Sequence, residues 1–139
     1  MKALISGYAR TPFHFANKGR LAKLRPDEMA SQLVAGLLSR LDVDPAALED
    51  VIAGCAYPEA AQGNNVARIV ALRAGLPVEV GGMTVNRFCG SSMSAIHIAA
   101  AQIEASRLPL PARAGPLGVR SRTSAHRRRT SPDPTRDSR

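Results

Sequence analysis

A cysteine in the second half of the chain has the sequence context of an activated nucleophile. Cys89 follows an apolar stretch that predicts a strand over residues 82–86, and it precedes small residues and a helix over 91–105. A helix N-terminus presents backbone N–H groups without intrahelical partners and the positive end of the helix dipole, so it favours an anion. The thiolate is the nucleophilic form of cysteine and is favoured at such a position. The pattern therefore predicts a cysteine that forms a covalent acyl thioester.

Other residues with reactive side chains have weaker patterns. Cys55 lies in an earlier apolar stretch, which indicates a buried structural cysteine. His97 follows Cys89 by eight residues in the predicted helix, about 12 Å along its axis, and is too far to act as its base. Two cysteines and three scattered histidines give neither a disulfide framework nor a metal site, so we expect no metal and no cofactor. No glycine motif for binding a nucleotide phosphate occurs.

Strands alternate with helices along the first 105 residues. The strands are predicted over residues 2–9, 50–56 and 82–86, and the helices over 26–41, 64–74 and 91–105. Pro26 opens the first helix, and Gly75 closes the second. The third helix is apolar or small on nearly every side, which is typical of a helix buried in a larger structure. This alternation predicts a layered α/β sheet, with the first strand buried.

The chain changes composition after Ala105. Residues 1–105 contain ten Lys and Arg against nine Asp and Glu, a net charge of +1, whereas residues 106–139 contain nine Arg and two Asp, a net charge of +7. The second segment is rich in Arg, Pro and Ser and has no helical or strand period, so we expect a disordered basic tail. The abrupt change suggests translation out of frame from a point near Ala105. A search of the other two reading frames of the gene tests this hypothesis, and finding no continuation of the fold in either frame would refute it.

Three stretches resemble the thiolase family. The stretch Val85-Asn86-Arg87-Phe88-Cys89-Gly90-Ser91-Ser92-Met93 is similar to the acyl-enzyme cysteine signature of that family, in the form found in degradative 3-ketoacyl-CoA thiolases. Residues 7–13 and 63–68 are similar to two upstream family stretches, in the expected order and spacing. The resemblance covers residues 1 to about 105.

The resemblance implies a fold and a chemistry. Thiolases are layered α/β proteins with a duplicated βαβαβαββ unit, so residues 1–105 are expected to be an incomplete first half and residues 106–139 a separate tail. The implied activity is acyl-CoA C-acyltransfer, either thiolysis of a 3-ketoacyl-CoA or condensation of acetyl-CoA, through an acyl-Cys89 intermediate. The family's Gly-His-Pro base and its second cysteine, in Cys-x-Gly, do not occur here. We therefore expect a truncated chain that does not turn over.

The implied partners are acyl-CoA and coenzyme A, and the family forms homodimers or homotetramers. The basic loop residues Lys18, Arg20, Lys23 and Arg25 could attract the phosphates of coenzyme A, although a solvated face is the more common role of such a cluster. The alternative function is non-catalytic, with nonspecific binding of nucleic acid through Arg127, Arg128 and Arg129 in the tail. No apolar run reaches the roughly 18 residues of a membrane span, so we expect no membrane partner and a cytoplasmic location.

Overall fold

The computed structural model of the chain describes residues 3–15, 17–105 and 117–120, the last four by their backbone. Its main elements, in chain order, are α1 (Pro26–Leu41), β1 (Asp50–Gly54), α2 (Val66–Arg73), β2 (Gly81–Val85), α3 (Ser91–Ala105) and β3 (Leu117–Arg120). Short 3₁₀ turns lie at Pro45–Ala47, Ala60–Gln62 and Phe88–Gly90. The predicted bounds of the first and third helices are confirmed, and those of the second helix and the two later strands agree within two residues.

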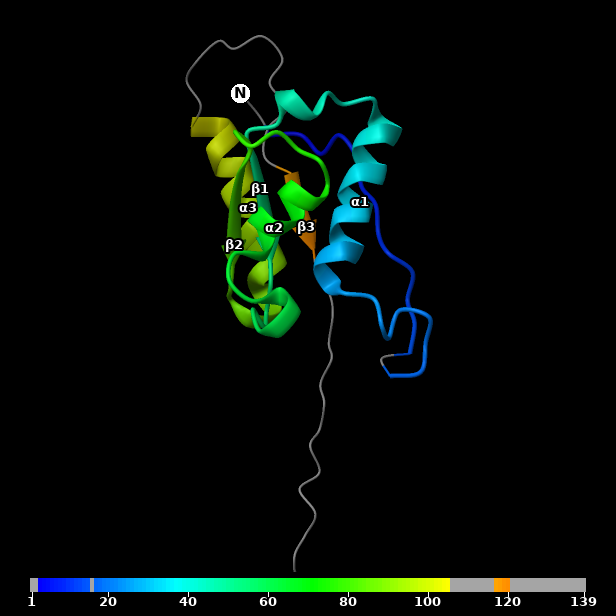
Figure 1. The fold of residues 1–139 in the computed structure, drawn as a ribbon. Helices are drawn as coiled ribbons and strands as arrows, with labels where there is room; N and C mark the ends of the chain where they lie inside the picture. Colours follow the sequence, from blue (N-terminus) through cyan, green and yellow to red (C-terminus); the bar gives the residue numbers. More distant parts are fainter. Residues whose placement is uncertain (1–2, 16, 106–116, 121–139) are drawn as a thin grey trace, which may run out of the picture.

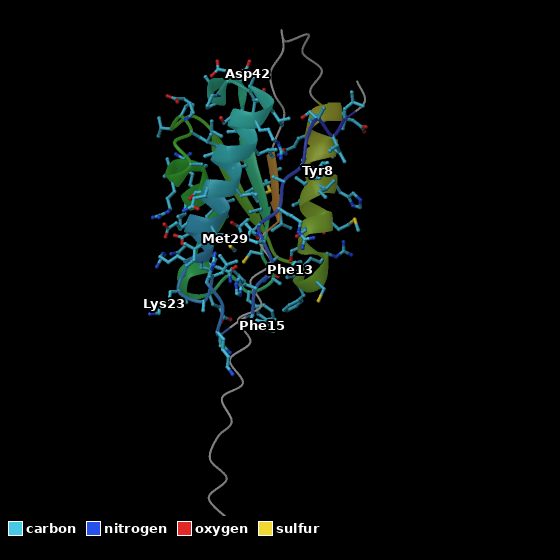
Figure 2. The ribbon with its side chains drawn as sticks, turned by 90° about the vertical axis from the view of Figure 1, so that its right-hand side faces the viewer. Tyr8, Phe13, Phe15, Lys23, Met29 and Asp42 are labelled. Carbon is cyan, nitrogen blue, oxygen red and sulfur yellow. The ribbon has the colours of Figure 1, made fainter. Side chains whose placement is uncertain are left out.

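The three strands form a parallel sheet in the order β2-β1-β3. The chain leaves β1 through α2 to reach β2, and it returns through α3 across β1 to reach β3. Because crossovers between parallel strands are right-handed, these oppositely directed connections place α2 and α3 on opposite faces of the sheet. Figures 1 and 2 show α1 and α3 on opposite sides of the strands. The predicted layered α/β arrangement is confirmed.

Each face of the sheet has its own core, and β1 contributes side chains to both cores. Val51 and Ala53 point to the face covered by α1 and α2, and Ile52 points to the face covered by α3, where Ala95 and Ala99 pack on it. Val51 and Ile52 are both fully buried. A strand buried on both faces is the expected state of a central parallel strand. The two cores therefore fix α3 relative to β1 independently of α1 and α2.

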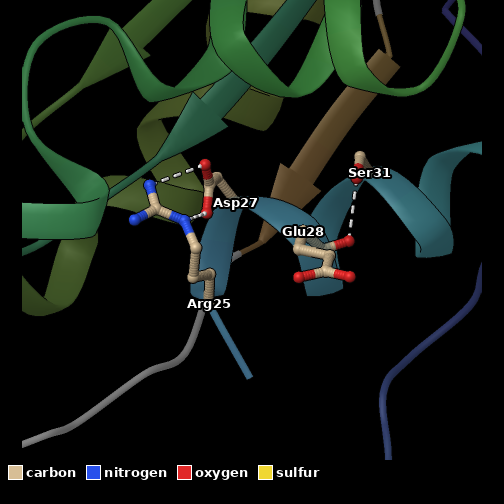
Figure 3. Close-up of polar contacts among 4 residues, drawn as sticks. All are labelled: Arg25, Asp27, Glu28 and Ser31. Atoms are coloured by element: carbon tan, nitrogen blue, oxygen red, sulfur yellow. Dashed lines mark hydrogen bonds and ion pairs between the residues drawn. The ribbon is translucent and has the colours of Figure 1, made fainter. Parts of the chain in front are cut away.

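Helix α1 begins at a proline, and an ion pair holds its first turn. The Nε and Nη2 atoms of Arg25 donate to the two carboxylate oxygens of Asp27 at 3.0 and 3.1 Å (Figure 3). Burial acts to raise the pKa of Asp27, but the hydrogen bonds and charge of Arg25, with smaller contributions from the Glu28 N–H and Arg73, hold that pKa below its ordinary value of 3.8. The paired carboxylate also complements the positive end of the helix dipole.

A glycine ends helix α2 as predicted. Gly75 has a φ of 78°, a left-handed conformation that glycine adopts without steric cost. Its N–H donates to the carbonyl of Leu72, and the N–H of Leu76 donates to that of Ala71. This pair of bonds is a Schellman motif, which satisfies the last carbonyls of the helix.

The prediction of a buried first strand is wrong for the described residues 3–9. This segment has no strand pairing, and Leu4 and Ile5 are 86% and 85% exposed. Apolar composition alone does not create strand pairing, and neither outer strand of the sheet, β2 or β3, has this segment as a neighbour. It runs beside α1 instead (Figure 1), where Arg40 donates to the carbonyl of Tyr8.

The prediction of a tail without regular structure is wrong at Leu117–Arg120, the part of residues 106–139 that is described. These four residues form β3, which pairs in parallel with β1 from Val51 to Gly54. Main-chain pairing with an open edge requires only a short extended backbone, which the composition of the segment does not reveal. The remainder of the predicted tail, including Arg127, Arg128 and Arg129, lies outside the described residues.

The start of α3 lies so close to the end of β1 that only glycine fits at the contact. A Cβ atom at Gly54 would lie 2.4 Å from the Ser92 nitrogen, whereas a Cβ at Gly36 in α1 would meet nothing within 4 Å. We expect Gly54→Ala to lower the free energy of unfolding by about 1–3 kcal/mol, because the helix must move off the sheet. The control Gly36→Ala should raise it by up to about 1 kcal/mol, through helix propensity. Urea unfolding of both variants measures the difference, and equal effects would contradict the close contact.

The ion pair at the start of α1 makes stability depend on pH. Because the pKa of Asp27 is lower in the folded chain, its contribution is present above the unfolded value of 3.8 and is lost as the pH falls through the folded value. We expect Asp27→Asn to lower the free energy of unfolding by about 1 kcal/mol at neutral pH and to flatten its decline below 3.8. The control Glu28→Gln, in the same turn, should retain that decline. Identical acid profiles for the two variants would contradict the assignment.

Candidate active site

The candidate site lies where the parallel strands end. Helices α1, α2 and α3 all begin at this edge, and β1 and β2 end there at Gly54 and Val85. This edge is also a topological switch point. The connection from β1 to β2 and the connection from β2 to β3 run in opposite directions across the sheet, over opposite faces. In open α/β sheets, ligands bind outside the carboxyl ends of the strands at such a switch point. The position of the strand-to-helix turn after β2 is therefore the expected place for a site.

Cys89 lies in that turn and is exposed. The chain passes from Val85 through Asn86 and Arg87 into a 3₁₀ turn at Phe88–Gly90, and α3 follows at once. The predicted strand, turn and helix around Cys89 are thus observed. Among the described residues, no side chain is hydrogen-bonded to its thiol. Within the described part of the chain, the Sγ atom is therefore open to a small reagent, and no base is hydrogen-bonded to it.

The backbone of the turn is held in an unusual conformation by polar side chains. Phe88 has a φ of 47°, in the left-handed region that bulky residues rarely adopt. Its N–H donates to the Asn86 Oδ1 atom at 3.0 Å. The Ser91 hydroxyl donates to the Phe88 carbonyl at 2.6 Å and accepts from the N–H of Arg87 at 2.8 Å. Side chains on both sides of Cys89 therefore restrain the peptide groups that precede it.

Cys55 has the opposite environment, as its sequence predicted. It follows β1 directly, is 1% exposed, and its thiol donates to the Gln62 Oε1 atom at 3.8 Å. Burial raises the pKa of the Cys55 thiol, and a hydrogen bond from the Tyr57 N–H opposes part of that shift. Its own N–H donates to the Val85 carbonyl at 3.0 Å, which ties the ends of β1 and β2 together. Cys55 is therefore a packed residue of the core that the sheet forms with α1 and α2.

Among the described residues, no hydrogen bond or ion pair links His14, His97 or the basic loop to Cys89. His97 is exposed in α3, eight residues beyond the cysteine. His14 accepts a hydrogen bond from the N–H of Phe15 within its own loop, and His126 lies outside the described residues. Lys18, Arg20 and Lys23 are exposed, and Arg25 is paired with Asp27. The exposed cations agree with the solvated face, and no contact connects them with the turn.

The contacts of three residues important to the turn were not identified from the sequence. Asn86 and Ser91 restrain its backbone, and Gly54 allows α3 to approach the sheet. Each had a weak local signal: an Asn two residues before the restrained N–H favours an Asx turn, a Ser is common at a helix start, and a Gly in a strand can mark a close approach. These signals were not specific enough to predict the contacts.

The described residues contain no candidate metal centre. Within them, no group of three or more His, Cys, Asp and Glu side chains could hold a metal ion. No helix of residues 3–15 and 17–105 is long and apolar enough to cross a membrane.

Comparisons with known proteins point to one family. Residues 3–110 match the family model described as the N-terminal domain of thiolase. The 3-ketoacyl-CoA thiolase of Saccharophagus degradans is 50% identical over 103 residues, which are 73% of this chain and 26% of the relative. The 3-ketoacyl-CoA thiolase of Psychrobacter arcticus is 49% identical over 61% of this chain and 22% of its own length. That of Vibrio cholerae is 45% identical over 68% of this chain and 24% of its own length. The chain thus spans about a quarter of the length of these curated relatives.

Proposed function

Because the chain belongs to the thiolase family, we propose that Cys89 is the acyl-accepting nucleophile of a thiolase-type acyl-CoA C-acyltransferase. The observation that supports this role is the exposed thiol on a restrained turn between β2 and α3, at the carboxyl edge of the parallel sheet. The relatives are 3-ketoacyl-CoA thiolases, so the proposed substrates are 3-ketoacyl-CoA and coenzyme A. The proposed chemistry requires no metal and no cofactor.

In the proposed thiolysis the Cys89 thiolate attacks the 3-keto carbon of a 3-ketoacyl-CoA. The bond between the second and third carbons breaks, and acetyl-CoA leaves as its enolate and takes up a proton. The acyl group remains on Sγ as a new thioester. Free coenzyme A then attacks that thioester, which releases the shortened acyl-CoA and restores the thiol. In the condensing direction, with an acyl-CoA as the donor, the carbon–sulfur bond to coenzyme A breaks and coenzyme A leaves as its thiolate.

The chain supplies the nucleophile but not the residues that assist it in the family. The 139-residue sequence contains neither a Gly-His-Pro nor a Cys-x-Gly stretch. Positioned proton transfer typically contributes about 10²–10⁴-fold to an enzymatic rate, so its loss slows each half of the reaction. We therefore propose that this chain alone accepts an acyl group and does not release it in repeated cycles.

Incubation of the chain with a 3-ketoacyl-CoA tests this proposal. We expect one acyl group per chain, located on the peptide that contains Cys89, and no continuing formation of acetyl-CoA when coenzyme A is added. The adduct should be absent from Cys89→Ser and unchanged in Cys55→Ser, and intact-mass and peptide-mass measurements detect both. An adduct that survives Cys89→Ser would contradict the assignment of the nucleophile. Turnover that depends on Cys89 would contradict the proposal that this chain alone does not release the acyl group in repeated cycles.

A further inference from the structure

The turn before Cys89 contains a bulky residue in a left-handed conformation. Four described residues other than glycine have a positive φ: Asp42, Ala60, Asn64 and Phe88. Asp42 caps α1, and asparagine tolerates this region well, but an aromatic residue at 47° is an outlier that the surrounding structure must maintain. Such outliers persist only where other contacts determine them, and they cluster at functional sites.

Core packing does not maintain this conformation. The Phe88 side chain is 67% exposed, and it belongs to neither of the two buried clusters. Arg87 and Cys89, on either side of it, are also exposed. A side chain that lies in solvent does not force its own backbone into a sparsely populated region.

Hydrogen bonds from two side chains supply the restraint. Asn86 accepts from the Phe88 N–H, and Ser91 donates to the Phe88 carbonyl, so both polar groups of this residue are held. Ser91 also accepts from the Arg87 N–H at 2.8 Å and is only 2% exposed. Its position is set by the start of α3, which rests on the end of β1 at Gly54. The Ser91 hydroxyl therefore couples the conformation of the turn to the position of α3.

We propose that Ser91 and Asn86 are positioning residues for Cys89. By holding Phe88 at a positive φ, they set the direction in which the next residue leaves the turn, and so the direction from which Sγ meets an acyl carbonyl. This role rests on the proposed acyl transfer to Cys89. Neither residue needs to contact the substrate, because both act through the backbone of Phe88. A misplacement of about 1 Å at a reacting atom can cost roughly a hundredfold in rate.

The substitution Phe88→Gly provides a specific test, because glycine adopts a positive φ without help. The full chain and its variants are treated separately with p-nitrophenyl acetate and with iodoacetamide. In the first reaction the Cys89 thiolate attacks the ester carbonyl, the carbon–oxygen bond breaks, and p-nitrophenolate leaves. In the second it displaces iodide, which requires exposure but little positioning. The ratio of the two rates separates positioning from accessibility, and the buried Cys55 reports any global opening.

We expect Ser91→Ala to lower the acylation rate by about tenfold and to change the alkylation rate by less than about twofold. In the Phe88→Gly background, Ser91→Ala should lower acylation by less than about twofold. Asn86→Ala should behave in the same way, and Asn86→Asp, which retains the accepting oxygen, should keep most of the rate. The control Ser94→Ala removes a hydroxyl from the next turn of α3 and should have no effect in either background.

Equal losses of acylation in the unaltered and Phe88→Gly backgrounds would overturn the positioning role. If the unaltered chain is alkylated at Cys89 but never acylated, the proposed acyl transfer is refuted. The role of Ser91 and Asn86 in positioning Cys89 for that reaction is then refuted as well. The restraint itself is then measured by urea unfolding, in which Ser91→Ala must destabilise the Phe88→Gly chain less than the chain that retains Phe88. Equal destabilisation of the two chains would show that Ser91 does not hold the left-handed turn.

Discussion

The contact between the start of α3 and the end of β1 is the constraint on which the rest of the site depends. Glycine at position 54 lets the Ser92 backbone reach the strand, and Ile52 packs against the small residues Ala95 and Ala99. This contact fixes the first turn of α3, including the buried Ser91 hydroxyl. The hydroxyl in turn holds the backbone of Phe88, next to Cys89. A side chain at Gly54 would therefore disturb the turn without touching the cysteine.

Much of the fold could be predicted from the sequence because local signals and burial agree. Pro26 and the apolar spacing up to Leu41 identify α1, and the apolar stretch over residues 50–56 identifies β1. The placement of Cys89 between a strand and a helix also follows from its neighbours. The prediction of these elements rests on the periodicity of apolar residues and on the residues that begin and end helices, and both can be read from a single sequence.

The features that the sequence did not predict depend on which segments become neighbours. The apolar residues 3–9 have the composition of a strand, but whether they pair depends on whether they reach an edge of the sheet, and neither β2 nor β3 has them as a neighbour. β3 arises in a segment whose composition indicates disorder, because backbone pairing is nearly independent of side chains. The left-handed Phe88 and the two bonds of the Ser91 hydroxyl likewise follow from tertiary contact. Propensity is only a weak guide where such contacts decide the outcome.

The two cysteines, which follow adjacent strands, show how the fold separates an exposed thiol from a buried one. Cys89 is exposed on the turn, whereas Cys55 is buried in the core with residues of α1 and α2, and burial raises its pKa. Timed alkylation of the native chain with iodoacetamide, with the product located by peptide mass, tests this separation most directly. We expect Cys89 to react at least about a hundredfold faster than Cys55, and the two rates to converge when urea unfolds the chain. Similar rates in the native chain would contradict the exposed position of Cys89 and the burial of Cys55.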